Sequence, residues 1–556
     1  MKPVACAVAT SVSVLAVATL LLPADRKPGH IAFEDVARRS GVNFVLRNSA
    51  TPEKHQIETM VSGIAVFDYN NDGKPDIYFV NGAHQPKLEK DDPAFYNRLY
   101  RNNGDGTFTD VTQQAGVRGE GFATGVAAAD FDNDGFTDLF IAGVNRNILY
   151  HNRGDGTFQD VTVKGGLDHD RSRPKPWSVG AGWFDYDNDG LLDLFVVNYC
   201  RWDPGGEPPS TAGGVRVYCH PKYYTGLPNS LYHNNGDGTF TDVSVASGIA
   251  AHVGKGMAVN FLDIDKDGLL DVFVTNDTVP NFLFRNEGGG RFREISMLAG
   301  VALNEDGRAV SSMGSDARDI DNDGREDLFV TAIFNETFPL FRNTGKRYFK
   351  DITYTSGMGR YTLPFTGWSN GIVDFDNDGW KDLFAACGSL GDNTEIFSGR
   401  KSRQHNLVFK NLANGKFEDV SVSAGLLEPG VHRGAAFGDF DGDGRVDAVV
   451  SRIGEAAELL RNTSPGGNHW LAVRLRGRRS NRDGIGALIH VVTASGAERW
   501  NRVTTATGYG CSSDRTAFFG LGKDGAAGRL EVAWPSGVHQ VLENVKMDRY
   551  LTVEEP

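Results

Sequence analysis

Residues 130–138 read Asp-Phe-Asp-Asn-Asp-Gly-Phe-Thr-Asp, and seven stretches of this chain share the pattern. Each has Asp at position one, Asp or Asn at position three, Asp-Gly at positions five and six, and Asp at position nine. Successive copies begin 55 to 78 residues apart. Repetition at such a period is typical of repeat architectures. The copies begin at Asp68, Asp130, Asp185, Asp263, Asp319, Asp374 and Asp439.

The acidic loops predict metal binding. Carboxylates at alternate positions of a tight turn, with Gly at the sixth, supply the oxygen ligands that Ca²⁺ prefers. The alternative is an ordinary Asx-rich turn, but turn chemistry alone requires neither a ninth-position Asp nor strict repetition. We expect up to seven structural Ca²⁺ ions, held by side chains at positions one, three, five and nine and by the backbone carbonyl at seven. These residues are Asp68, Asn70, Asp72, Lys74 and Asp76; Asp130, Asp132, Asp134, Phe136 and Asp138; Asp185, Asp187, Asp189, Leu191 and Asp193; Asp263, Asp265, Asp267, Leu269 and Asp271; Asp319, Asp321, Asp323, Arg325 and Asp327; Asp374, Asp376, Asp378, Trp380 and Asp382; and Asp439, Asp441, Asp443, Arg445 and Asp447.

The loops are not EF-hands. An EF-hand closes with a bidentate Glu at its twelfth position and lies between helices. Here the twelfth position is apolar, as in Ile141 and Val196, and lies inside a strand-like run. The ion is therefore expected to close a turn between two strands.

A second pattern recurs between the loops. An apolar-aromatic-basic-Asn run, a Gly-rich turn and Phe follow one another, as in Leu99-Tyr-Arg-Asn102 before Phe108. Asp-Gly between apolar runs is a strong hairpin signal. Each repeat thus predicts four short antiparallel strands, and seven repeats predict an all-β, seven-bladed propeller. The basic residue is interpreted as a solvated strand-edge charge; it is Arg101, His151, His233, Arg285, Arg342, Lys410 or Arg461.

The last repeat lacks its fourth strand. No Phe-x-Asp-Val run follows Leu459-Leu-Arg-Asn462, whereas an orphan copy, Ile31-Ala-Phe-Glu-Asp-Val36, lies at the other end of the chain. We predict that this N-terminal strand closes blade seven, so that the propeller spans residues 31–465. The position five residues before each loop is small, which fits innermost strands that converge on an axis. It holds Gly63, Gly125, Gly180, Ala258, Gly314, Ser369 and Gly434.

Composition and the N-terminus indicate an exported protein. The net charge is −14 over 556 residues, but the ligand positions of the seven loops alone hold 27 carboxylates, so the charge belongs to the ion sites. This balance and export disfavour a nucleic-acid role. Residues 1–24 predict a signal peptide, with an uncleaved N-terminal membrane anchor as the alternative. A secreted, periplasmic or cell-surface monomer is expected, and Cys200 and Cys219 are a candidate disulfide.

The loops and hairpins of the propeller resemble the FG-GAP/VCBS repeats, the class that includes integrin α-subunit heads. Residues 468–556 resemble the ASPIC/UnbV module, on Asn468-His-Trp-Leu, Asn481-Arg-Asp-Gly-Ile-Gly-Ala487, Phe519-Gly-Leu-Gly522 and Trp534-Pro-Ser-Gly537. This order is similar to that of the cartilage acidic protein family and its bacterial relatives. The resemblance implies a secreted Ca²⁺-binding protein. The alternating apolar runs of the tail by themselves predict a small β-sandwich or barrel.

For ligand binding, we predict a cation-rimmed central mouth on the face of the long loop insertions. The loops that enter the innermost strands carry His55, Arg118, Lys175, Lys255, Arg308, Arg360 and Arg433. With the innermost-strand residues Asn260, Asp316 and Arg318, Lys255 and Arg308 form the candidate site for an anionic glycan or a small acid; a protein is the other ligand expected for the module. The function expected is a non-catalytic binding or adhesion module. The alternative is a calcium-assisted polysaccharide lyase, for which His55, Lys255, Arg308 and Asp316 are loose candidates.

Gly367-Trp-Ser-Asn-Gly371 matches the nucleophile-elbow pattern of hydrolases. That motif needs a strand, a sharp turn and a helix, and this context is absent from the sequence around Ser369. We therefore predict no catalytic residue here.

Overall fold

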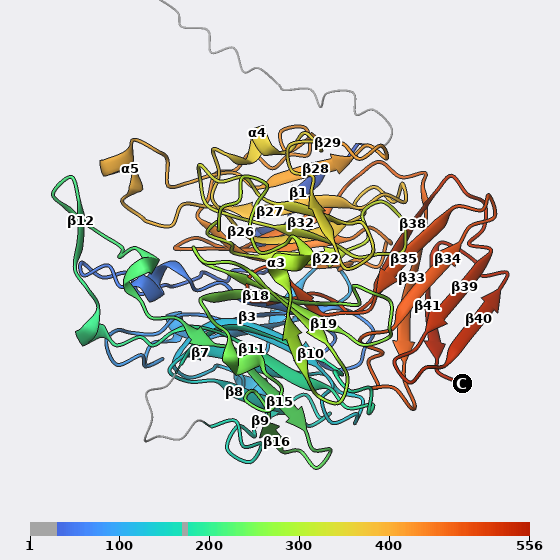
Figure 1. Ribbon diagram of the computed structural model, residues 1–556, viewed down its shortest axis with the longest axis horizontal. Helices are drawn as coiled ribbons and strands as arrows, with labels where there is room; N and C mark the ends of the chain where they lie inside the picture. The colour runs from blue at the N-terminus through green and yellow to red at the C-terminus, as the bar shows by residue number, and fades with distance from the viewer. Residues whose placement is uncertain (1–29, 169–175) are drawn as a thin grey trace, which may run out of the picture.

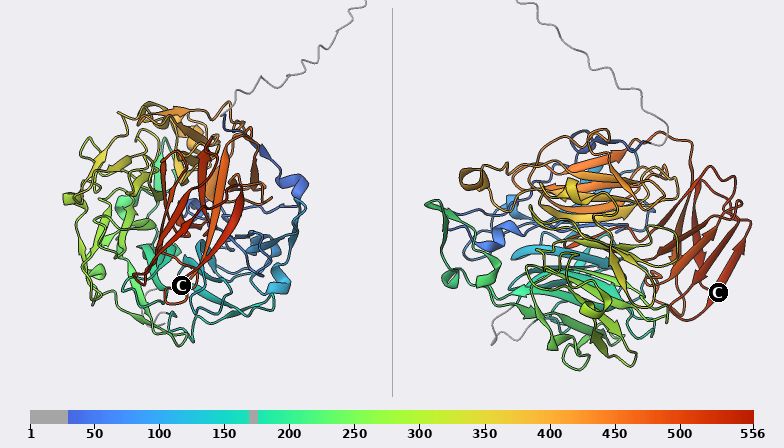
Figure 2. Two further views of the ribbon diagram at one scale, coloured as in Figure 1. Left: turned by 90° about the vertical axis from the view of Figure 1, so that its right-hand side faces the viewer. Right: turned by 45° about the horizontal axis from the view of Figure 1, so that its top comes forward.

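The computed structural model describes residues 30–168 and 176–556, so the predicted signal segment lies outside the described residues. Seven four-stranded antiparallel blades surround a central axis (Figures 1 and 2). The prediction of a seven-bladed propeller is confirmed.

The blades are built as follows. Blade one contains β2 Ile64–Phe67, β3 Asp76–Phe79, β4 Arg98–Asn102 and β5 Phe108–Asp110; blade two contains β6 Phe122–Ala129, β7 Asp138–Val144, β8 Ile148–Asn152 and β9 Phe158–Asp160. Blade three contains β10 Trp177–Phe184, β11 Asp193–Cys200, β15 Ser230–Asn234 and β16 Phe240–Asp242; blade four contains β18 Gly256–Leu262, β19 Asp271–Asn276, β20 Phe282–Asn286 and β21 Phe292–Glu294. Blade five contains β22 Ser315–Arg318, β23 Asp327–Val330, β24 Leu340–Asn343 and β25 Phe349–Asp351; blade six contains β26 Gly367–Val373, β27 Asp382–Cys387, β28 Leu407–Asn411 and β29 Phe417–Asp419. Blade seven contains β30 His432–Gly438, β31 Asp447–Arg452, β32 Glu458–Asn462 and β1 Phe33–Asp35.

Short elements connect these strands. They include the helices α1 Ala37–Ser40, α2 Thr112–Ala115, α3 Ser296–Ala299, α4 Gly359–Thr362 and α5 Thr394–Ser398, the 3₁₀ turns η1 Gln56–Thr59, η2 Pro93–Phe95, η3 Pro204–Gly206, η4 Pro221–Tyr223 and η5 Ile249–Ala251, and the short strands β12 Ser210–Ala212, β13 Val215–Val217, β14 Leu227–Pro228 and β17 Val253–Gly254.

The N-terminal strand closes the ring as predicted. β1 pairs antiparallel with β32, with Phe33 opposite Asn462. Each acidic loop joins the innermost strand of a blade to its second strand, and the second strand begins at the ninth-position Asp, as at Asp138. The apolar residues of neighbouring blades pack together, and Tyr78, Leu99 and Val126 share one such core between blades one and two.

The tail forms a separate β-sandwich against one end of the ring. One sheet has the order β38 Ala517–Gly522, β33 His469–Arg476 and β41 Arg549–Glu554; the other has the order β35 Glu498–Arg502, β34 Leu488–Val492, β39 Arg529–Ala533 and β40 His539–Glu543. Leu471 and Val553 of the first sheet share a core with Ile489 and Leu530 of the second. In Figure 2 this tail domain lies over the centre of the ring.

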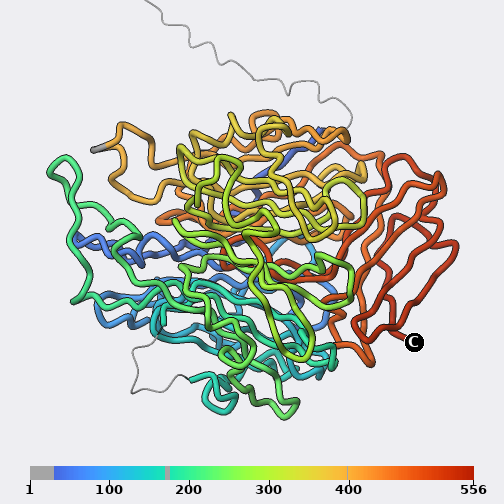
Figure 3. The backbone as a smooth tube through the Cα atoms, in the orientation of Figure 1, coloured from blue at the N-terminus to red at the C-terminus, as the bar shows by residue number. Residues whose placement is uncertain are grey.

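The tail domain sends a segment into the propeller axis, and this segment is called the axial hairpin, residues 504–513. It contains β36 Ala506–Thr507 and β37 Cys511–Ser512, and β37 pairs in parallel with β2 of the propeller. In Figure 3 the chain of the tail passes into the middle of the ring. At the tip, Tyr509 is fully buried, and its hydroxyl donates to the carbonyl of Met60 at 2.9 Å.

Contact with the axial hairpin is a second steric constraint that requires small residues at these positions of the innermost strands. A Cβ added at Gly125 or Gly180 would lie 3.1 or 3.2 Å from the Cα of Gly510, and one added at Gly314 would lie 3.1 Å from the Tyr509 nitrogen. The sequence predicted close approach of strands at these positions. The structure adds a chain from another domain.

The predicted disulfide is wrong. Cys200 and Cys219 are both free and buried. They pack in an apolar cluster with Tyr199, Trp202 and Tyr224, where a thiol acts as a small hydrophobic side chain. Cys387 and Cys511 are also free and buried.

Candidate functional site

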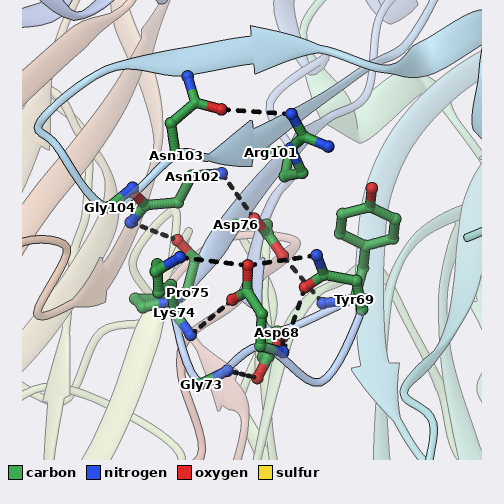
Figure 4. Close-up of polar contacts among 12 residues, drawn as sticks. Asp68, Tyr69, Gly73, Lys74, Pro75, Asp76, Arg101, Asn102, Asn103 and Gly104 are labelled. Carbon is green, nitrogen blue, oxygen red and sulfur yellow. Dashed lines mark hydrogen bonds and ion pairs between the residues drawn. The ribbon is translucent and has the colours of Figure 1, made fainter.

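The first acidic loop shows how the turn is held (Figure 4). Asp68 at position one accepts the backbone N–H groups of Asp72 at 3.1 Å and Gly73 at 2.7 Å. Asp76 at position nine accepts N–H from Tyr69 at 3.0 Å and from the hairpin residue Asn102 at 2.7 Å. The ninth Asp thus ties the loop to the third strand of its blade. The same pair of bonds recurs at Asp138, Asp193, Asp271, Asp327, Asp382 and Asp447.

Carboxylate oxygens converge inside the loops. Ligand atoms of Asp130, Asp132 and Asp138 lie within 4.8 Å of one another. The same holds for Asp185, Asp187 and Asp189 in the third loop and for Asp263, Asp265 and Asp271 in the fourth. At the third position, Asp265, Asp321 and Asp376 each have a buried Oδ1 without a hydrogen-bond partner. Buried acceptors normally have partners. An all-oxygen donor set with such acceptors fits a hard divalent cation.

The electrostatics of the loops also favour a bound cation. Burial is the main cause that raises the pKa of Asp76 and Asp271 to about 8, and neighbouring loop carboxylates add to it. Burial likewise raises the pKa of Asp130 and Asp185 to about 7. Concentrated negative charge away from water is unfavourable unless a positive charge offsets it.

The basic hairpin residues were predicted to be solvated charges at strand edges. In five repeats they instead contact the carboxylates of the acidic loops. Arg285 Nε lies 2.9 Å from the Asp265 carboxylate, and His233 Nδ1 lies 3.2 Å from Asp193. His151, Arg342 and Lys410 make the equivalent contacts. In contrast, Arg461 faces Glu34 at 3.7 Å.

Two asparagine positions link neighbouring blades, and sequence reasoning missed this role. The hairpin residue Asn152 donates from Nδ2 to the carbonyl of Tyr69 in the previous loop at 2.8 Å. The fourth loop residue, Asn133, donates to the carbonyl of Gly190 in the next loop at 3.0 Å. The recurrence of both residues was the available signal. The seventh-position residues predicted as carbonyl ligands donate their N–H to the fifth-position Asp, as Phe136 does to Asp134 at 2.8 Å.

The tail domain docks on the acidic loops. Asp483 accepts the backbone N–H of Asp130 at 2.9 Å, and the Tyr550 hydroxyl donates to Asp439 at 2.7 Å. Lys381 Nζ donates to the carbonyl of Trp500 at 2.9 Å. The loop face of the propeller is therefore the interface with the tail.

The predicted cationic mouth is wrong, because its residues do not meet. Asn260 and Arg318 contact the tail: Asn260 donates to the Ala506 carbonyl at 3.4 Å and Arg318 to the Arg502 carbonyl at 2.8 Å. Asp316 is buried beside them, where its Oδ2 accepts N–H from Ile372 at 2.8 Å.

The other predicted cations lie elsewhere. Lys255 is buried near Asp277, and Arg308 is exposed on a loop. His55 pairs with Glu207 at 2.5 Å, and Arg433 is buried over the Trp368 ring. Lys175 lies outside the described residues. The candidate lyase residues His55, Lys255, Arg308 and Asp316 therefore form no common site either.

A pocket opens instead at the end of the axis opposite the tail domain, and we call it the axial pocket. Its volume is about 270 Å³. Met257, Met313 and Trp368, which immediately precede the small residues of three innermost strands, line it. The remaining lining comes from residues 56, 59–60, 217–221, 277–278, 311, 333–334, 389–391 and 393–394.

Comparison with known proteins identifies the class. The FG-GAP-like repeat model matches residues 68–141, 130–196, 223–274, 263–330, 319–385 and 392–450, which together include all seven acidic loops. Residues 477–556 match the ASPIC and UnbV model. The chain belongs to the FG-GAP-like repeat proteins, with an ASPIC and UnbV domain at its C-terminus.

The chain is similar to cartilage acidic protein 1. It is 25% identical to the mouse protein over 512 residues, which are 89% of this chain and 74% of the relative. It is 28% identical to the human protein over 303 residues, which are 53% of this chain and 43% of the relative. The human match thus spans less than half of that relative.

Among solved structures, a lectin from Agrocybe aegerita that recognises non-reducing terminal N-acetylglucosamine aligns with 65% of this chain and 79% of its own. The TM-score is 0.38 at 17% identity. YCF48 bound to a D1 peptide aligns with a TM-score of 0.41 at 8% identity, over 80% of this chain and all of that one. These scores are too low to carry an argument about ligands. None of the helices in residues 30–168 and 176–556 has the length and apolar character that a membrane span requires.

Proposed function

We propose that this protein is a secreted, calcium-loaded propeller that acts as a non-catalytic binding module for an extracellular ligand. One Ca²⁺ ion in each of the seven acidic loops would join the strands of a blade and hold the docking surface of the tail domain. The observation that carries the proposal is the buried, unpartnered third-position oxygen of Asp265, Asp321 and Asp376 beside further carboxylates.

The role of the ions is structural in this proposal. At an extracellular-type dissociation constant of about 10⁻⁴ M and millimolar calcium, each site stabilises the fold by about 1.5 kcal/mol. Seven such sites approach the stability of a typical domain. The loops contact the tail domain in this arrangement, and catalysis by the ions is not part of the proposal.

A substitution at the third position tests the ion sites one at a time. Asp265→Asn keeps the size of the side chain but removes the charge, so we expect the mature protein to bind one calcium ion fewer and to melt at a lower temperature in calcium. Asp306→Asn is the matched control, because Asp306 is exposed and outside the loops. Equal calcium content in both variants, measured by equilibrium dialysis, would show that the loop containing Asp265 holds no calcium ion.

The pH dependence of folding stability should have opposite signs in the calcium-free and the calcium-loaded protein. Burial raises the pKa of Asp76 and Asp271 to about 8 in the folded, calcium-free protein, above the ordinary value of about 4 when unfolded. The folded state then binds more protons, so calcium-free stability rises as pH falls from 8 to 5. Calcium binds the carboxylates, so acidification instead weakens the calcium-loaded protein. Between pH 8 and pH 6, the urea midpoint should rise in EDTA and fall in calcium. A shift in the same direction under both conditions would contradict the proposal.

A further inference from the structure

The axial pocket has the size of a small-molecule site. A cavity of about 150 Å³ lined by apolar side chains is large enough for benzene. The axial pocket has about 270 Å³, which suits a molecule with two fused rings. Met60, Met257, Met313, Trp368, Ile333 and Leu390 give it an apolar lining. Methionine side chains adapt to ligands of irregular shape.

Among the described residues that line the pocket, Asp277 is the one acidic residue, and none of them is Lys or Arg. It is 3% exposed, and its Oδ2 accepts the Tyr199 hydroxyl at 2.9 Å. Two cations lie behind the lining. Lys255 is buried close to Asp277, and Arg433 donates to the carbonyls of Thr59 and Ser389. Asp277 is thus a lining residue of the pocket, whereas Lys255 and Arg433 are not among its lining residues.

Three distant segments join to form the rim of the pocket. Asn393, in the insertion of blade six, donates to the carbonyl of Arg216 in the insertion of blade three at 2.6 Å. Arg216 in turn donates to the carbonyl of Glu53 at 2.8 Å, and Lys54 pairs with Asp392 at 2.7 Å. Figure 1 places these insertions, marked by β12 and α5, at the end opposite the tail domain. The long loops thus enclose the pocket.

The floor of the pocket is supported by the tail domain. The Tyr509 ring lies 5.2 Å from the ring of Trp368, and its hydroxyl binds the backbone of Met60. Both contacted residues line the pocket. The pocket therefore depends on the ring, the insertions and the axial hairpin together.

We propose that the axial pocket binds a small amine with an apolar body of about two rings, with its amino group at Asp277. This inference rests on the binding role proposed above and names its ligand class. The rings replace water against the Met and Trp side chains, and burial of apolar surface favours binding. The amino group donates a charge-assisted hydrogen bond to the carboxylate, while an anion of the same shape is repelled.

Isothermal titration of the calcium-loaded mature protein with tryptamine tests the proposal. We expect a dissociation constant below about 1 mM. Indole-3-acetate, which carries a carboxylate in place of the amine, should bind at least tenfold more weakly. Failure of tryptamine to bind at several millimolar, or a preference for indole-3-acetate, would overturn the inference.

Variants separate the amine contact from the apolar contact. Asp277→Asn should weaken tryptamine at least tenfold and leave 3-ethylindole, which lacks the amine, unchanged. Ile333→Trp places a larger ring in the partly exposed wall and should abolish binding of both probes. Asp306→Asn, at an exposed position that does not line the axial pocket, is the control and should change neither. Full tryptamine binding by Ile333→Trp would place the ligand elsewhere and overturn the assignment.

The outcome is distinguishable from failure of the calcium proposal, because calcium content is measured on the same samples. Calcium-loaded protein that binds no amine contradicts only the ligand assignment. Amine binding by protein that holds no calcium contradicts only the role of the loops.

Discussion

Chelation of calcium should lower the melting temperature of the protein by more than about 10 °C. Without bound metal ions, the loop carboxylates are buried close to one another, and one buried oxygen each of Asp265, Asp321 and Asp376 loses its hydration without gaining a hydrogen bond. Because the tail domain binds the same loops, it should loosen with them. Thermal unfolding followed by circular dichroism, in millimolar calcium and in EDTA, measures the shift.

Two controls make this result specific. Excess calcium added back to the chelated sample should restore the melting temperature. Magnesium at the same concentration should restore less, since it demands a tighter octahedral shell and gives up water reluctantly. Equal melting temperatures in calcium and in EDTA would show that the loops are ordinary turns.

Tyr509→Ala should destabilise the protein by about 3–5 kcal/mol, the usual cost of truncating a large buried aromatic side chain. Tyr509 is fully buried at the axis, next to Trp368, and its hydroxyl bond to Met60 is lost as well. The axial hairpin should then leave the ring more readily. Urea unfolding measures the stability, and limited proteolysis between residues 463 and 468 measures release of the tail domain.

Matched variants distinguish packing from the hydrogen bond. Tyr509→Phe keeps the ring and removes only the hydroxyl, so about 1 kcal/mol is expected. Tyr223→Ala removes a ring that is 60% exposed and should have little effect. An unchanged urea midpoint and an unchanged cleavage rate for Tyr509→Ala would mean that the axial hairpin does not join the two domains.

The sequence predicted the features that repeat or that local chemistry controls. The acidic loops, the four-stranded blades and the closing strand around Phe33 follow from turn chemistry and strand periodicity, which act over a few residues. The number of copies of the loop then predicted the number of blades. The tail was expected to be a β domain for the same reason.

The features that depend on long-range contacts were missed. Gly508-Tyr509-Gly510 is a short unremarkable stretch, and only the assembled ring shows that it fits between Gly125 and Gly180. Their assignment to innermost strands placed Asn260 and Arg318 near the axis, but it could not show that the tail domain binds there. The predicted ligand residues were therefore distributed over both ends of the axis.

The cysteine and arginine predictions failed for a similar physical reason. Cys200 and Cys219 bracket one long loop, but sequence separation does not determine the distance and direction that a disulfide requires. Arg433 was expected at a solvent-exposed rim, yet it is 1% exposed because backbone carbonyls satisfy its guanidinium group.

The number of calcium ions bound per chain tests the central claim most directly. Elemental analysis of the protein, after gel filtration in buffer with micromolar calcium and again after dialysis against millimolar calcium, gives this number. The proposed loops predict a rise toward seven ions per chain in millimolar calcium. Fewer than one ion per chain at both concentrations would contradict the account.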